Sequence, residues 1–185
     1  MEKGAPIVFR LTYRRSCIGY YPLVKKISLE GQKPMNAIEL LKADHDKVDK
    51  LFQQVKATED SEHPAIFEKI NAELEVHTHI EETIFYPALL EDGDEELQDI
   101  TKEGIEEHRQ AKMFLRELSN LAEGSDKFEP KLKVLMEDIE HHVMEEEGEM
   151  FKMVEEQFDA ETLEALGKEL EAEKSKFRRS QAKGA

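Results

Sequence analysis

Four histidines and two glutamates in this sequence have the types and spacing of transition-metal ligands. They are His45, His77, Glu81, His108, His142 and Glu146. In two places the glutamate follows the histidine by four residues, which puts both side chains on one face of a helix. Imidazoles and carboxylates together suit a first-row transition metal. Six such groups exceed the needs of one tetrahedral zinc and fit two ions, each with two histidines, with the glutamates bridging and an open position remaining.

Each of these residues interrupts a stripe of apolar residues spaced three and four apart, which is typical of an amphipathic helix. Prolines suited to a first helical turn and short runs with glycine or aspartate divide the sequence into segments. The predicted helices cover about residues 36–57, 64–90, 95–122 and 130–157, followed by a shorter one over about 159–177. The pattern predicts an all-α fold: an antiparallel up-down-up-down four-helix bundle with a short extra C-terminal helix.

The four histidines should lie at one depth in this bundle. Counted from turns near residues 60, 93 and 125, each lies 15 to 17 residues from the turns that flank it. At about 1.5 Å per residue, these offsets agree to within one helical turn. Two unpaired carboxylates in the same layer would each cost several kcal/mol or stay protonated, whereas a bound cation would stabilise them. A single core histidine is usually a packing residue, but four in one layer with two glutamates favour a metal site.

The remaining histidines do not follow the stripes. His63 lies at a helix start and His79 is off the stripe, so both are expected to be solvated. His141 is out of phase with its helix, although an error of phase there would exchange it with His142 as the ligand.

The segments that hold these residues resemble the hemerythrin-like, or HHE, cation-binding family. The similar segments are 41–52, 77–87, 107–108 and 142–151, in that order, within about residues 36–156. The resemblance implies a non-heme centre of two iron ions, with the four histidines as terminal ligands. Glu81 and Glu146 would bridge the ions together with an oxo or hydroxo group. Zinc or manganese could bind the same atoms, so the choice of iron rests on the resemblance.

One position departs from the oxygen-carrying members of that family. Those proteins have a second histidine one turn after the third-helix ligand, where this sequence has Lys112. The chain therefore resembles a four-histidine branch, which includes proteins tied to iron–sulfur repair, nitric oxide and iron sensing. Fewer protein ligands favour small-molecule reactivity or regulated iron occupancy over pure oxygen carriage.

Other residues near the motifs have more than one interpretation. Pro87 lies inside the second helix, removes one backbone hydrogen bond and should kink the helix. Tyr86 could shield the site, although filling the core is the commoner role of an aromatic residue. Gly148 could allow a close backbone approach or could simply be tolerated.

The composition of the chain disfavours several classes of partner. The chain has 185 residues, with 26 Lys and Arg against 42 Asp and Glu and a formal net charge of −16. Such a charge disfavours nucleic acid and anionic membranes as partners. No apolar run approaches the roughly 18 residues of a membrane span, and no secretory signal is recognisable. The single cysteine, Cys17, allows no internal disulfide, so a cytoplasmic location is expected.

The charge also divides the chain into parts. Residues 1–34 hold seven basic and two acidic side chains, and residues 174–185 hold five basic and no acidic ones. We therefore expect a flexible basic N-terminal extension over 1–34, the bundle over 35–157, and a C-terminal helix with a basic tail over 158–185. Met35 could equally be the natural start of the protein.

These observations lead to three functional hypotheses. The first is a di-iron protein that binds or senses O2, NO or peroxide, as a monomer or weak homo-oligomer and with a possible redox partner. The second is an iron donor for iron–sulfur cluster repair or storage, and the third is a metal-free helical interaction protein. No catalytic residue is assigned, so an enzymatic activity such as peroxidase, oxidase or NO reductase stays open, with a non-enzyme preferred.

Overall fold

A computed structural model describes residues 8–12, 23–27 and 35–184. The chain divides into two units, 1–34 and 35–185. In the first unit, strands β1 (Val8–Thr12) and β2 (Leu23–Ile27) pair antiparallel, with Val8 opposite Ile27. The rest of the expected flexible extension, including Cys17, lies outside the described residues.

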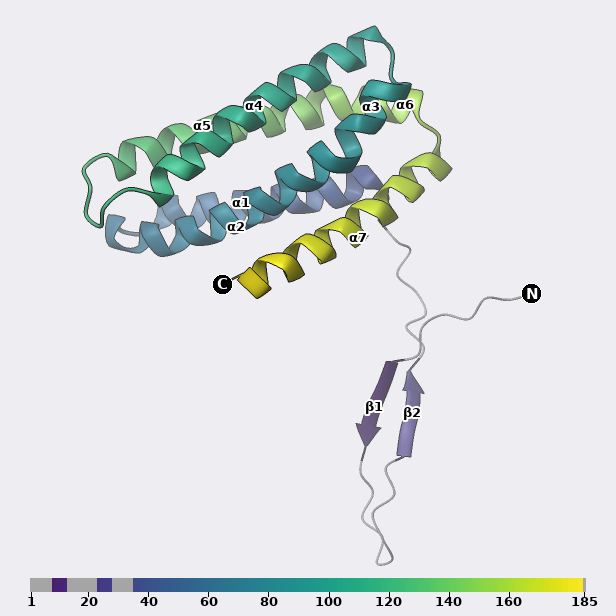
Figure 1. Cartoon of the computed structure of the whole chain (residues 1–185), viewed down its shortest axis with the longest axis horizontal. Helices are drawn as coiled ribbons and strands as arrows, with labels where there is room; N and C mark the ends of the chain where they lie inside the picture. The colour runs from purple at the N-terminus through teal and green to yellow at the C-terminus, as the bar shows by residue number, and fades with distance from the viewer. Residues whose placement is uncertain (1–7, 13–22, 28–34, 185) are drawn as a thin grey trace, which may run out of the picture. The chain divides into compact units, whose positions relative to one another are not determined.

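The second unit is the predicted antiparallel four-helix bundle (Figure 1). Its first helix is α1 (Ala37–Ala57). The second is interrupted, with α2 (His63–Ile80), a π-helical turn η2 (Glu81–Phe85) and α3 (Tyr86–Asp92). The third is α4 (Glu95–Ser119). The fourth repeats the interruption, with α5 (Phe128–Glu145), a π-helical turn η3 (Glu146–Met150) and α6 (Phe151–Gln157).

Local sequence signals begin and separate these helices. Asn36 caps α1 in a capping box with Glu39, and Asp94 accepts from the backbone N–H of Leu97 at the start of α4. A 3-10 turn, η1 (Asp60–Glu62), precedes α2. Gly124, with a φ of 72°, makes the turn between α4 and α5 in the left-handed region that glycine adopts without a steric penalty.

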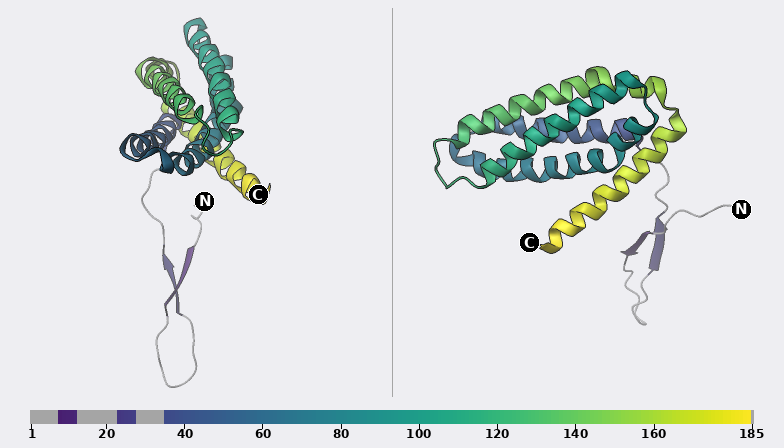
Figure 2. Two further views of the ribbon diagram at one scale, coloured as in Figure 1. Left: turned by 90° about the vertical axis from the view of Figure 1, so that its left-hand side faces the viewer. Right: turned by 45° about the horizontal axis from the view of Figure 1, so that its top comes forward.

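The fifth helix is longer than predicted. α7 (Ala160–Gly184) has 25 residues and extends past Phe177 through the stretch expected to be a tail. It packs across α1 and α2 (Figures 1 and 2). A Cβ atom on Gly167 would lie 2.4 Å from the backbone oxygen of Met35, so glycine permits this close approach. Lys174 is buried on α7 and donates to Asp44 of α1 at 2.5 Å.

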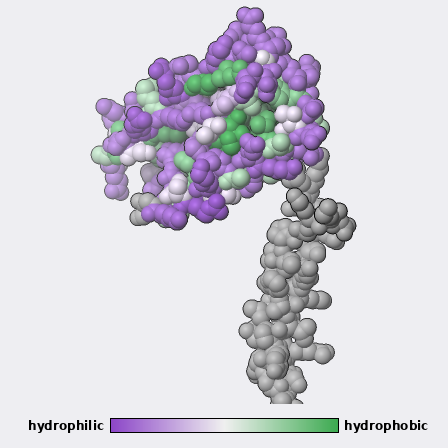
Figure 3. Space-filling view, turned by 45° about the vertical axis from the view of Figure 1, so that its right-hand side comes forward, coloured by the Kyte–Doolittle hydropathy of each residue, from purple (hydrophilic) through white to green (hydrophobic). Residues whose placement is uncertain are grey.

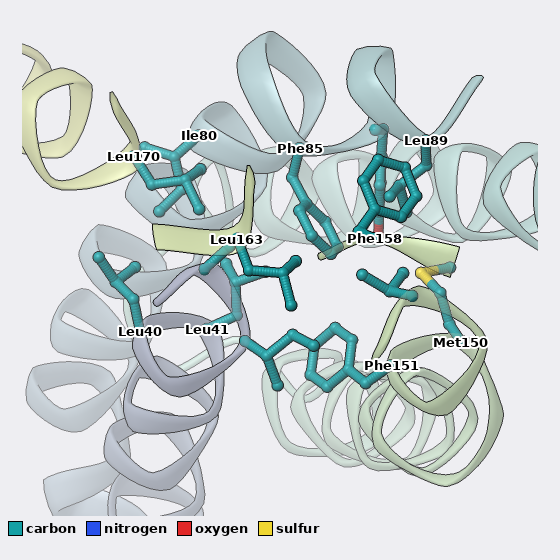
Figure 4. Close-up of a cluster of buried hydrophobic side chains, with 14 of the residues drawn as sticks. Leu40, Leu41, Ile80, Phe85, Leu89, Met150, Phe151, Phe158, Leu163 and Leu170 are labelled. Atoms are coloured by element: carbon teal, nitrogen blue, oxygen red, sulfur yellow. The ribbon is translucent and has the colours of Figure 1, made fainter. Parts of the chain in front are cut away.

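The core consists of two apolar clusters. One lies where α3, α6 and α7 meet the start of α1 and includes Phe85, Phe151 and Leu163 (Figure 4). The other lies toward the α1–α2 and α4–α5 connections and includes Phe52, Leu74 and others. Along every bundle helix, the predicted ligand histidine falls between residues of one cluster and residues of the other. The histidines therefore form a polar layer that separates two apolar halves.

On the face shown in Figure 3, hydrophilic residues predominate and apolar side chains show in smaller patches between them. None of the described helices has the length and apolar character needed to cross a membrane.

Candidate metal centre

The bundle brings all six predicted ligand residues into its core. Each is at most 5% exposed, and Glu81 is fully buried. The histidines come from α1, α2, α4 and α5, and the two glutamates are the first residues of η2 and η3. It is His142 that faces the core, whereas the neighbouring His141 is 57% exposed.

The four imidazoles form two facing pairs. The Nε2 atoms of His45 and His77 are 3.2 Å apart, and those of His108 and His142 are 3.1 Å apart. All four Nε2 atoms therefore point toward the bundle axis. Two nitrogen lone pairs at this separation need a shared proton or a cation between them.

The two glutamates lie between the imidazole pairs. The Oε2 atom of Glu81 is 3.1 Å from Nε2 of His77 and 3.3 Å from Nε2 of His108. The Oε2 atom of Glu146 is 3.3 Å from Nε2 of His45 and 3.5 Å from Nε2 of His142. Each carboxylate thus contacts one imidazole of each pair, which is the position that a bridging ligand must occupy.

Two overlapping groups of possible ligand atoms result. His45, His77, Glu81 and Glu146 offer atoms within 4.8 Å of one another, and Glu81 shares the second group with His108 and His142. Both oxygens of Glu81 and Oε2 of Glu146 are buried without a hydrogen-bond partner. Burying such groups unpaired costs free energy that a bound cation would offset. The donor set therefore fits a bound metal cation.

Three of the imidazoles are oriented by a carboxylate that lies behind the ring, meaning at Nδ1 rather than at the Nε2 atom of the layer. The Nδ1 atoms of His45 and His142 lie 2.7 Å from Glu147 and Glu107, respectively. Nδ1 of His108 lies 3.2 Å from Glu82. Such contacts hold the proton on Nδ1 and leave Nε2 free to bind a metal.

Burial and charge give these groups unequal pKa values. Burial raises the pKa of Glu81 well above its ordinary value, and the Glu146 charge adds to the rise. Burial lowers the pKa of His77 well below its ordinary value. Burial also acts to raise the pKa of Glu146, but His142 and His45 outweigh it and lower that pKa. Without a cation, these effects favour the charged carboxylate at Glu146 and disfavour it at Glu81.

Tyr86 is part of this site, although the sequence favoured a packing role for it. Its fully buried hydroxyl donates to Oε1 of Glu146 at 2.7 Å and lies 3.3 Å from Nε2 of His108. Burial raises the pKa of this phenol well above its ordinary value, and the Glu146 and Glu81 charges add to the rise. A Cβ on Gly104 would come within 3.1 Å of the hydroxyl, so the glycine leaves room for it.

The π-helical turns explain why helical periodicity did not place Tyr86 in the layer. Tyr86 and Phe151 each follow a bridging-position glutamate by five residues, and their backbone N–H groups donate to the carbonyls of Glu81 and Glu146. This wider turn brings a residue at i+5 onto the face where an α-helix would present i+4. The Phe151 ring accordingly stacks parallel to His45, with 5.9 Å between centroids.

The structure shows the surroundings of two residues that could disturb their helices. Pro87 does follow an irregularity, because η2 ends two residues before it. The same turn recurs in η3 without a proline, so proline is not required for it. Gly148 allows no close approach: its Cβ position meets nothing within 4 Å.

The expectation that His63 is solvated is wrong. It is 6% exposed, and its ring nitrogens lie 2.7 Å from Glu129 and 3.3 Å from the carbonyl oxygen of Thr58. His79 is 30% exposed and is covered by α7, where it contacts Glu173 at 3.0 Å and stacks on Phe177. Neither environment is visible from helical phase, because each depends on a partner distant in the sequence.

Comparisons with known proteins found similarity over most of the chain. A solved hemerythrin HHE cation-binding domain-containing protein from Mycobacterium kansasii is 27% identical and has a TM-score of 0.65, over 79% of this chain and 89% of that chain. A curated relative named a DNA nickase, from Nostoc sp., is 26% identical over 161 residues, or 83% of this chain. The chain spans only 44% of that relative's length. The family described as the hemerythrin HHE cation-binding domain matches residues 36–154, and the chain belongs to this family.

Proposed function

We propose that the bundle holds two iron ions and binds or senses a small molecule such as O2, NO or peroxide. His45 and His77 would bind one ion, His108 and His142 the other, and the two glutamates would bridge them. The observation that carries this proposal is the placement of each buried glutamate oxygen between one imidazole of each pair. Iron supplies reversible one-electron chemistry and exchangeable coordination positions in such a centre.

The protein's own residues shape the surroundings of the ions. The carboxylates behind three of the histidines keep the protons on Nδ1 and make the imidazoles stronger donors. Among the described residues, Tyr86 has the one side-chain hydroxyl that donates a hydrogen bond to a residue of the layer. It would orient Glu146 and keep its own proton, because its pKa is raised.

Two depressions lie beside the layer and suit small ligands. One, of about 480 Å³, lies between α1 and α5 and is lined by His45, by apolar side chains such as Phe52 and Met144, and by four carboxylates. A smaller cavity, of about 140 Å³, lies between α4 and α5 against His108 and His142. A diatomic molecule fits either space.

Anaerobic loading with ferrous iron, followed by metal analysis and optical titration with O2 and then NO, tests the proposal. We expect about two iron ions per chain, as the two donor groups require, and a spectral change with at least one of the two gases. Iron binding without any gas-dependent change would favour the iron donor or storage role instead. Failure to bind iron, zinc or manganese would leave the metal-free interaction protein.

The structure gives little support to that last alternative. The basic residues of α7 would be the natural docking surface of such a protein, but Lys174 is buried against Asp44 and Arg178 pairs with Glu73 at 2.7 Å. We also propose no nucleic-acid role from the name of the Nostoc relative. The bundle is strongly acidic, and the net charge of −16 opposes approach to phosphates. Plasmid nicking by the purified protein would contradict this.

A further inference from the structure

In the described part of the chain, Lys112 is the one lysine or arginine that pairs with a carboxylate in contact with a histidine of the layer. Its Nζ atom lies 2.5 Å from Oε1 of Glu82, the same oxygen that lies 3.2 Å from Nδ1 of His108. The three groups form a chain from the surface to an imidazole of the layer. Lys112 therefore reaches the site through Glu82 without entering the layer.

The two other carboxylates behind imidazoles lack such a partner. Glu107 and Glu147 contact His142 and His45 at 2.7 Å, and among the described residues neither is ion-paired to a lysine or arginine. Exposure does not explain the difference, since Glu82 is 34% exposed, Glu107 26% and Glu147 36%. Glu82 differs from Glu107 and Glu147 in two ways: it pairs with the ammonium group of Lys112, and its contact to the histidine is longer.

The fourth imidazole has no carboxylate behind it, because Nδ1 of His77 is buried without a hydrogen-bond partner. Each pair thus contains one imidazole whose carboxylate has no lysine or arginine partner among the described residues, His45 in one pair and His142 in the other. Each pair also contains one imidazole with little or no anionic support, His77 and His108. A carboxylate behind a ligating histidine raises the basicity of the imidazole and its affinity for the metal.

We propose that Lys112 is a positioning residue that neutralises Glu82, weakens the support which Glu82 gives to His108, and so keeps the two metal positions matched. This inference rests on the proposed function. Without Lys112, the pair of His108 and His142 would have a full carboxylate behind both imidazoles, and its metal position would be the stronger one.

Competition between the protein and a coloured chelator for Co2+ tests the inference, because it measures metal affinity without iron chemistry or activity. Removing a carboxylate behind a ligand typically costs about 10- to 100-fold in affinity. We therefore expect Lys112→Met to tighten the first binding step by up to about tenfold and to separate the two steps. Lys112→Arg keeps the charge and should restore wild-type binding.

A double-mutant cycle separates this role from a general effect of charge. In a Glu82→Gln background, Lys112→Met should change the affinity no further, because the carboxylate through which Lys112 acts is absent. Lys102→Met is the matched control: it removes an exposed cation of α4 that pairs with Asp99 at 2.8 Å, and should leave both steps unchanged.

The outcomes distinguish a failure of the proposed function from a failure of the inference about Lys112. If the wild-type protein binds no Co2+ or Fe2+, the proposed function fails. If it binds Co2+ but Lys112→Met leaves the affinity unchanged, or changes it equally with and without Glu82, the inference about Lys112 is overturned and the proposed function stands.

Discussion

Replacing Glu81 by methionine should make the metal-free protein more stable than wild type and the metal-loaded protein less stable than wild type. Glu81 is fully buried and neither of its oxygens has a hydrogen-bond partner. A buried polar group without a partner costs about 1–3 kcal/mol. Methionine has similar length, no polar group and a flexible side chain that fills irregular space. We therefore expect Glu81→Met to raise the unfolding free energy of the metal-free protein by about 1–3 kcal/mol.

In the metal-loaded state the order should invert. A metal at 100 times its dissociation constant adds about 2.7 kcal/mol to the wild-type protein. The variant lacks a bridging ligand and should gain much less. Urea unfolding measured by circular dichroism, after chelator treatment and again with saturating Co2+, gives both comparisons. A shift of 1 kcal/mol corresponds to about 2–4 °C in Tm for a domain of this size.

Glu68→Met is the matched control, because Glu68 is an exposed glutamate on α2, the helix that leads into η2 and Glu81. We expect it to change the free energy by no more than about 0.5 kcal/mol in either state. If Glu81→Met destabilises the metal-free protein, the layer is not strained by this carboxyl and the reasoning fails. If the variant keeps wild-type metal affinity, Glu81 is not a ligand.

Three further predictions concern other groups. His142→Ala should remove at least one bound metal ion per chain while the far-ultraviolet circular dichroism stays helical. His141 is its exposed neighbour, and His141→Ala should keep all the bound metal. Equal losses in the two variants would refute the choice of His142 as the ligand. Tyr86→Phe removes the bond to Glu146 and should cost the metal-free protein about 1.5–3 kcal/mol in urea unfolding, as is typical of a hydrogen bond to a charged group; a neutral effect would show that the bond is not made. Burial acts to lower the pKa of His63, but Glu129 outweighs it and the pKa is raised above 6.5. Its stabilisation is then complete below pH 6.5 and lost as the pH rises through the folded-state value. His63→Gln should therefore cost more stability at pH 5.5 than at pH 8.5, and a pH-independent cost would contradict the shift.

Much of this architecture follows from local patterns. The apolar stripes and capping residues predicted the four bundle helices to within a few residues of their observed bounds. The same periodicity, with counting from the turns, predicted that His45, His77, His108 and His142 share a layer with two glutamates. It succeeded because, in an antiparallel bundle with short connections, distance from a turn fixes depth and helical phase fixes direction.

The remaining features depend on contacts between segments distant in the sequence. The π-helical turns at Glu81 and Glu146 shift the helical phase by one residue, and only this shift brings Tyr86 to the layer. The burial of His63 requires Glu129 from another helix, and the length of α7 reflects its docking on α1 and α2. The sequence alone determined which groups could meet and at what depth, because those are properties of single helices. Tertiary packing decided which carboxylates lie behind three of the imidazoles, and that Lys112 pairs with Glu82. Those partners come from other helices, and no local pattern encodes which way these helices face.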